Sequence, residues 1–162
     1  MQLGDASLLL VHLDRERIGS ALLEALPAAG DVNVVRLLDV IVVTRRAARR
    51  GSLTEIDVSE LALAGITLRT PGLIGVEDAA GLTAHLDIGA SAAIILVEHS
   101  AAAGAASALP LLHDRIIEVR RVPASVANAI WQSAEAVPVT RPHRIRRRCT
   151  MTYPAVHDTA RP

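Results

Sequence analysis

The chain carries the same strand–helix–strand pattern twice, and this duplication constrains the fold more than any other feature. The first copy begins at Leu9 and the second at Ile95. Each copy runs from an apolar strand through an alanine- and leucine-rich helix to a second β-branched strand. Arg36 and Asp39 interrupt one of these strands, where a bulge or bend is expected. The expected segments are strand 7–13, helix 17–28 and strand 32–44, then strand 92–98, helix 101–112 and strand 115–122.

Two units of this kind predict an α+β fold. Because such crossovers are right-handed, the units combine into a ferredoxin-like sandwich, with an antiparallel sheet and helices mainly on one face. The first strands of the two units would lie side by side at the centre, parallel to each other. A return strand over 53–58 and an extra helix over 72–86 lie between the units, and a last helix spans 124–136. The apolar stripe expected on the last helix is Val126, Ala127, Ile130 and Trp131.

Length and charge divide the chain into a ferredoxin-like domain over 1–136 and an arginine- and proline-rich tail over 137–162. Residues 1–135 hold 11 Arg against 16 acidic residues, a net charge of −5, whereas 136–162 hold 6 Arg against Asp158, a net charge of +5. Prolines interrupt the tail, so no regular structure is expected there. Phe is absent and there is one Trp and one Tyr, which excludes a sheet that stacks nucleic-acid bases on aromatic residues.

The chain is expected to be cytoplasmic and to lack a transmembrane segment. Its single cysteine, Cys149, can form no internal disulfide, and the first residues lack the basic stretch of a signal peptide. The apolar stretch 88–112 is long enough to cross a membrane, but Glu98 lies in its middle. Its first half is strand-like and its second half helix-like, which favours a soluble strand followed by a helix.

Four packing motifs recur at the expected strands and turns. They are 35–42 (VRLLDVIV), 55–61 (EIDVSEL), 89–98 (GASAAIILVE) and 121–126 (RVPASV). Together they resemble the pattern of a family of small actinobacterial proteins, a domain of unknown function. The resemblance covers roughly residues 7–135, implies a ferredoxin-like fold and implies no established activity. The tail departs from the family's usual length, so nothing carries over to it.

One polar group could form a ligand-binding or catalytic pocket. The repeat makes His12 and Glu98 equivalent, at the C-terminal ends of the central strands and on the face away from the helices, with His99 next to them. A carboxylate beside an imidazole could act as acid and base. The alternative is a structural polar pair, because no nucleophile or third group is evident. Asp14 could extend the group towards a metal site, but no metal-binding spacing occurs, so no catalytic residue, metal or cofactor is predicted.

The sheet face away from the helices is expected to be apolar. An exposed apolar patch usually marks an interaction site. Either the helix over 72–86 covers this face or a second copy does, which would give a homodimer or higher homo-oligomer. The residues expected at this interface are Leu8, Leu10, Ile94 and Leu96.

Two arginine clusters could contact a polyanion, either nucleic acid or an anionic membrane surface. The alternative is a solvated turn and a tail that is disordered or docked on the acidic body. The clusters are Arg45, Arg46, Arg49 and Arg50 in the turn, and Arg144, Arg146, Arg147 and Arg148 in the tail.

The sequence thus favours a non-enzymatic, self-associating cytoplasmic protein with a scaffold, regulatory or stress-linked role. One alternative is a small-molecule-binding or catalytic module near His12, Glu98 and His99. Another is a polyanion adaptor that acts through the arginine-rich tail.

Overall fold

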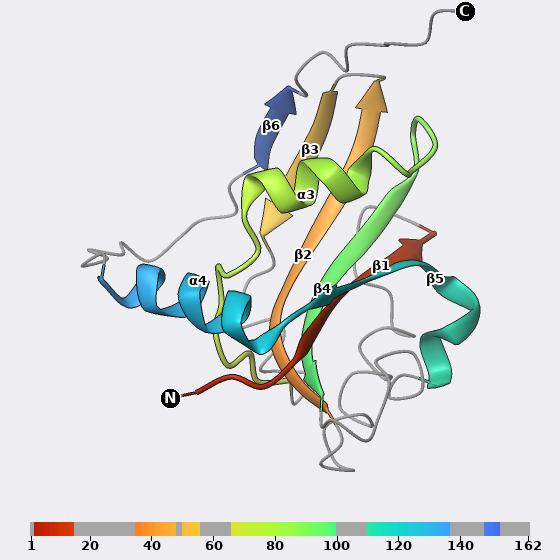
Figure 1. Ribbon diagram of the computed structural model, residues 1–162. Helices are drawn as coiled ribbons and strands as arrows, with labels where there is room; N and C mark the ends of the chain where they lie inside the picture. The colour runs from red at the N-terminus through yellow and green to blue at the C-terminus, as the bar shows by residue number, and fades with distance from the viewer. Residues whose placement is uncertain are drawn as a thin grey trace, which may run out of the picture.

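A computed structural model describes residues 2–14, 35–47, 50–55, 66–99, 110–136 and 148–152 (Figure 1). In these ranges the chain forms one six-stranded sheet in the order β5-β1-β4-β2-β3-β6, with every neighbouring pair antiparallel. The fold is therefore α+β. The helix expected over 17–28 and most of that over 101–112 lie outside the described residues. The elements are β1 (Ala6–Leu13), β2 (Val35–Ala47), β3 (Arg50–Glu55), α3 (Val76–Thr83), β4 (Ser91–His99), η1 (Pro110–Arg115), β5 (Ile116–Val122), α4 (Ala124–Ala136) and β6 (Arg148–Thr152).

The central strands β1 and β4 are covered on both faces. Successive side chains of a strand point to opposite faces of the sheet. Leu9 and Leu10 are both fully buried, and so are Ile94 and Ile95. This double burial explains why both strands are apolar at almost every position rather than alternating with polar residues.

The two first strands of the repeat are neighbours, as predicted, but they run antiparallel, so the predicted parallel pairing is wrong. Ala6 pairs with Glu98 at one end and His12 pairs with Ala92 at the other. The reason lies in how the units interleave. Strands β1 and β2 both flank β4, and β4 and β5 both flank β1. Each unit therefore keeps its own two strands parallel while the first strand of the other unit runs between them in the opposite direction.

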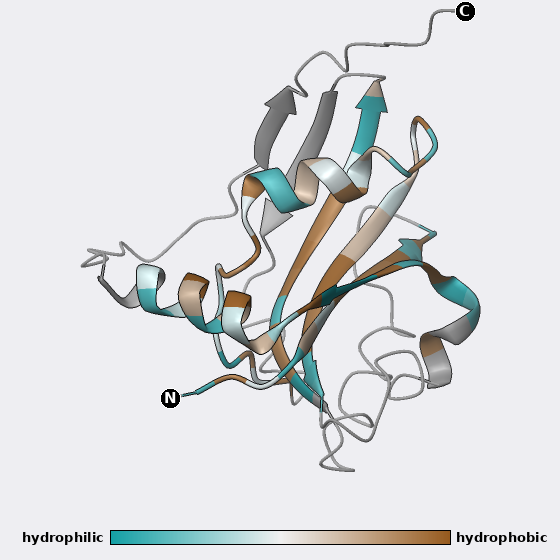
Figure 2. Ribbon diagram, in the orientation of Figure 1, coloured by the Kyte–Doolittle hydropathy of each residue, from teal (hydrophilic) through white to brown (hydrophobic). Residues whose placement is uncertain are grey.

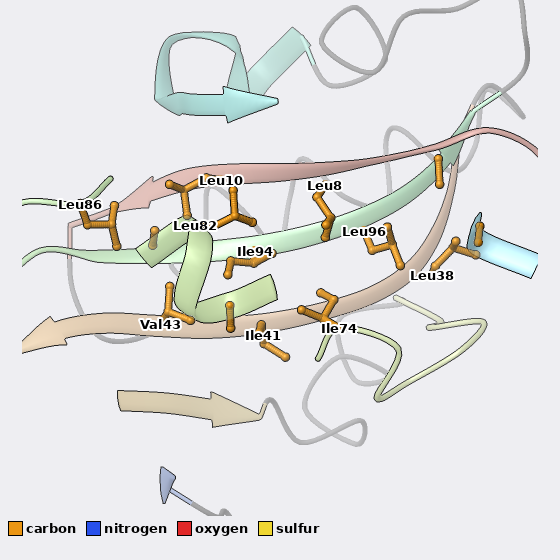
Figure 3. Close-up of a cluster of buried hydrophobic side chains, with 14 of the residues drawn as sticks. Leu8, Leu10, Leu38, Ile41, Val43, Ile74, Leu82, Leu86, Ile94 and Leu96 are labelled. Atoms are coloured by element: carbon orange, nitrogen blue, oxygen red, sulfur yellow. The ribbon is translucent and has the colours of Figure 1, made fainter. Parts of the chain in front are cut away.

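Helices α3 and α4 lie on the same face of the sheet and close a hydrophobic core (Figures 1 and 3). Helix α3 contributes Ala79 and Leu82, and α4 contributes Ala127. The four residues predicted as an interface with a second copy lie in this core, so that prediction is wrong. The other alternative holds, because the chain's own α3 covers this face. These four residues are Leu8, Leu10, Ile94 and Leu96, and all are buried in the single chain.

Strand β2 is bent by a bulge. Its register against β4 shifts between Leu37 and Asp39, so Leu38 is the extra residue. The segment before α3 returns to this bulge, where the amide of Thr70 donates to the carbonyl oxygen of Leu38 at 2.9 Å. The irregularity expected near Asp39 is therefore present.

Part of the tail joins the sheet. Strand β6 pairs with β3, with Arg50 opposite Thr152 and Leu53 opposite Cys149. The expectation that 137–162 lack regular structure does not hold for this segment. Strand β6 is the last strand of the described sheet, so it covers the edge that β3 would otherwise expose (Figure 1).

The apolar stretch 88–112 is not one helix. Its middle forms β4, and η1 begins at Pro110. Among the described residues, no helix is long and apolar enough to span a bilayer.

Candidate functional site

The predicted pairing of His12 with Glu98 does not occur. In the β1–β4 register Glu98 lies opposite Ala6, whereas His12 lies opposite Ala92. The two side chains are therefore about six residues apart along the sheet, roughly 20 Å at the usual rise of a strand. The C-terminal ends of two antiparallel strands lie at opposite ends of the strand pair. The prediction from the repeat was therefore wrong, because it assumed that the two strands run in the same direction. His12 instead lies 4.0 Å from Asp14 (Nε2 to Oδ1), at the opposite end of β1 from Glu98.

Glu98 is a buried carboxylate that holds the segment before β1. Its Oε1 accepts a hydrogen bond from the amide of Gly4 at 2.6 Å, and its Oε2 lies 3.3 Å from Nη1 of Arg36. The approach is close, because a Cβ on Gly4 would lie 3.2 Å from Oε1, so a larger residue here would need the Glu98 carboxylate to move by a few tenths of an ångström. Both oxygens of Glu98 are thus engaged by its own chain.

His99 points to the other face of the sheet from Glu98, because the two residues are consecutive in β4. Its Nε2 lies 3.0 Å from Oγ of Ser7. A hydroxyl at this distance from an imidazole is the first element of a nucleophile–base pair. Ser7 is only 1% exposed, however, and Nδ1 of His99 is buried with no hydrogen-bond partner in the described part of the chain. The hydroxyl is therefore closed to a substrate in this conformation.

Asp39 is a buried carboxyl in the middle of an apolar strand. Burial raises the pKa of Asp39 above its ordinary value, against backbone hydrogen bonds from Ile74, Gly72, Val40 and Leu73 that lower it. Its Oδ1 accepts from the amide of Val40 at 2.9 Å and its Oδ2 accepts from the amide of Ile74 at 2.8 Å. The carboxylate thus fastens the loop before α3 to the bulge in β2.

Arg45 holds the C-terminal end of α3. Its Nη1 donates to the carbonyl oxygen of Ala84 at 2.7 Å and also to that of Leu86. A cation near the C-terminal end of a helix is also favoured by the helix dipole. Its main chain bonds the following turn, because Arg45 donates to Ala90 and accepts from Gly89. Arg45 therefore has a role in the fold, and its predicted contact with a polyanion stays a prediction.

The remaining arginines of the predicted polyanion site are placed only in part. Arg46 is exposed on β2. Arg50 lies in β3 and Arg148 in β6, on neighbouring strands of the sheet. The others lie outside the described residues, so polyanion binding stays a prediction. These others are Arg49, Arg144, Arg146 and Arg147.

Sequence reasoning missed two groups of exposed apolar side chains, one on β5 and one on α4. Ile117 and Val119 on β5 are 44% and 43% exposed, and Val126 and Ile130 on α4 are 46% and 41% exposed. Figure 2 shows the apolar residues along both elements. Ala127 and Trp131 turn to the core instead, so only half of the predicted stripe is buried. The signal was present, because Val126 and Ile130 are one helical turn apart and form a separate face.

Charged residues accompany these apolar residues on β5. Nη2 of Arg120 donates to Oε1 of Glu118 at 3.1 Å, and Nδ1 of His85 lies 3.4 Å from Oε2 of Glu118. Glu118 and Arg120 lie opposite Leu10 and Leu8 of β1, on the face that carries α3. The α3 face of the strand thus carries the Glu118–Arg120 pair, whereas the other face carries exposed Val119 together with Arg121.

Comparison with known proteins gives a family but no activity. No curated protein and no solved structure matches the chain significantly. The model of a family of unknown function, DUF6325, matches residues 2–137. This range takes in every described element except β6, and it agrees with the resemblance to a domain of unknown function. The chain therefore belongs to the DUF6325 family, whose function is unknown.

Proposed function

We propose that this protein is non-enzymatic and acts by self-association through exposed apolar side chains of β5 and α4, as a scaffold or regulatory component of the cytoplasm. The observation that carries the proposal is the distribution of exposed apolar side chains. Among the described residues, six large hydrophobic side chains are exposed, and four of them lie on these two consecutive elements. A concentration of this kind marks an interaction surface.

The polar groups support a non-catalytic role. Glu98 bonds Gly4 and Arg36, Asp39 fastens the loop before α3, and Arg45 holds the end of that helix. Each of these groups is already engaged within the chain. Catalytic groups must instead face a substrate within hydrogen-bond reach.

We also propose a ferredoxin-like sandwich as the architecture that presents this surface. The support is the order of the four strands that belong to the repeat, β5-β1-β4-β2, in which each unit is split by a strand of the other. In this arrangement β5 is an edge strand and α4 follows it directly. The exposed residues therefore lie at one side of the sandwich, with Val119 on the face away from α3 and those of α4 on the α3 face.

Sedimentation velocity of the full chain over a range of micromolar concentrations tests self-association. We expect a dimer or larger species that dissociates on dilution. Ile117→Ser together with Val119→Ser should shift the equilibrium towards monomer without changing the circular dichroism spectrum. Ile88→Ser is the matched control, because Ile88 is 63% exposed but lies in the turn before β4, and it should leave the equilibrium unchanged. A chain that stays monomeric at every concentration would refute the proposed function.

A further inference from the structure

Strand β5 ends the sheet on one side. Among the described strands it pairs with β1 alone, so its other edge carries main-chain groups that no described strand uses. An edge of this kind is a ready template for another strand. Its central residue, Val119, is flanked by Glu118 and Arg120, charges of opposite sign. This pattern determines how a second copy of the same strand could pair with it.

Two identical strands can pair antiparallel about a two-fold axis perpendicular to the sheet. An axis at Glu118 would place Glu118 opposite itself, and an axis at Arg120 would place Arg120 opposite itself. Like charges directly opposite each other destabilise a strand pair. An axis at Val119 instead places each Glu118 opposite Arg120 of the other copy, so both cross-strand pairs are attractive.

We propose that two copies of the chain join their sheets by pairing β5 with β5 antiparallel about an axis at Val119. This inference rests on the proposed self-association and names its interface. Glu118 and Arg120 already lie together, with 3.1 Å between Oε1 and Nη2, and both are on the α3 face. The second copy completes a square of four charges in which each charge has opposite charges as neighbours along and across the strands.

The other face of β5 supplies the apolar part of the interface. Val119 lies opposite Leu9 of β1, on the face away from α3, and is 43% exposed at the edge. In the proposed register Val119 packs against Val119 of the second copy, and Ile117 packs along the aliphatic part of Arg121. The bulge in β5 is at Ile117, where the register against β1 shifts. It therefore lies at the end of the paired segment and leaves the central three residues regular.

Charge reversal isolates the contacts between copies from those within one chain. Glu118→Arg gives a chain with two positive charges at these positions, and Arg120→Glu gives a chain with two negative charges. Each variant alone should weaken the dimer about 10-fold or more, because both cross-strand pairs become repulsive. An equimolar mixture of the two should recover a heterodimer in native mass spectrometry, because every pair across the axis is attractive again. Recovery on mixing also shows that both variants fold.

Crosslinking tests the register. Directly opposite residues have Cα atoms about 4.5–5.5 Å apart, within disulfide range. In a Cys149→Ser background, Val119→Cys should give a disulfide-linked dimer under mild oxidation, whereas Arg121→Cys should not. A wild-type dimer that neither charge variant weakens, or that crosslinks through Arg121→Cys and not Val119→Cys, would overturn this interface and leave self-association standing. A wild-type monomer would overturn both.

Discussion

Asp39 illustrates how one polar residue in an apolar strand organises its surroundings. It follows the bulge at Leu38, where the strand no longer matches its neighbour residue for residue. The buried carboxylate accepts hydrogen bonds from its own strand and from Ile74 in the loop before α3. Burying a carboxylate costs free energy unless it is hydrogen-bonded, and here main-chain donors supply those bonds.

The raised pKa of Asp39 predicts a pH dependence of stability. Because the folded pKa is above the unfolded one, the folded state binds more protons between the two values. The contribution of Asp39 to the free energy of unfolding is therefore greatest near or below about pH 4 and falls as the pH rises through the folded pKa. Asp39→Asn removes this component and leaves a main-chain donor unpaired, which costs about 1–3 kcal/mol.

Urea denaturation of both chains from about pH 4 to pH 8 checks this sign. The stability advantage of the wild type over Asp39→Asn should be largest at the acid end and should shrink as the pH rises. An advantage that grows with pH would show that hydrogen bonding outweighs burial at this carboxyl.

Sequence alone could place an irregularity at Asp39 but could not identify its partner. A single acid within an apolar strand signals a local break. Ile74 is far along the chain, and only the folded main chain brings its amide to Oδ2. The predicted contact between His12 and Glu98 was wrong for a related reason. It depended on the relative direction of the two strands, which residue types do not encode.

Helix α3 covers the central strands through a narrow apolar stripe. Ala79 and Leu82 are fully buried, whereas Val76 at its start is 54% exposed. The helix is shorter than the predicted 72–86 segment, because the residues before Gly75 form the loop that bonds Asp39. Its apolar periodicity was predicted correctly, and its start was obscured by apolar residues of that loop.

Deleting the Leu82 side chain should open a cavity under α3. We expect Leu82→Ala to lower the free energy of unfolding by about 2–5 kcal/mol, measured by urea denaturation. Val76→Ala on the same helix is the control and should change it by no more than about 0.5 kcal/mol. Equal effects of the two substitutions would mean that α3 does not seal the core.

The exposed side of α4 shows a limit of periodicity. The predicted bounds of this helix match the observed ones, Ala124–Ala136. Its pattern contains two apolar faces, and only the one with Ala127 and Trp131 packs on the sheet. Which face is covered depends on the neighbouring strand, so the sequence predicts the helix but not its orientation.

At the scale of the whole molecule, the duplicated pattern predicted which of its strands are neighbours. It did not predict β6, the strand added beside β3 at the edge of the sheet. Strands β1 and β4 are central, as two interleaved units require. Strand β6 comes from residues beyond the family match, which ends at residue 137, and its composition shows no apolar run. Its place in the sheet depends on the free edge of β3 rather than on its own propensity.

Removing residues 138–162 should therefore uncover β3. Hydrogen exchange of the truncated chain should show faster exchange at the alternate β3 amides that face β6, while β1 and β4 stay protected. The full chain is the reference. An open edge also promotes association between sheets, so turbidity at high concentration should increase. Unchanged exchange in β3 would show that β6 does not protect it in solution.

The fastening of α3 by Arg45 has a consequence for what the molecule can admit. The side chain of Arg45 is hydrogen-bonded to the end of the helix, and its main chain is hydrogen-bonded to the turn that follows. A helix that opens as a lid needs one loosely held end, and the C-terminal end of α3 is hydrogen-bonded to β2. Because the segment before α3 is also bonded to β2 through Ile74 and Asp39, the helix is held at both ends. A ligand or partner would therefore contact the outside of α3 rather than the apolar core beneath it.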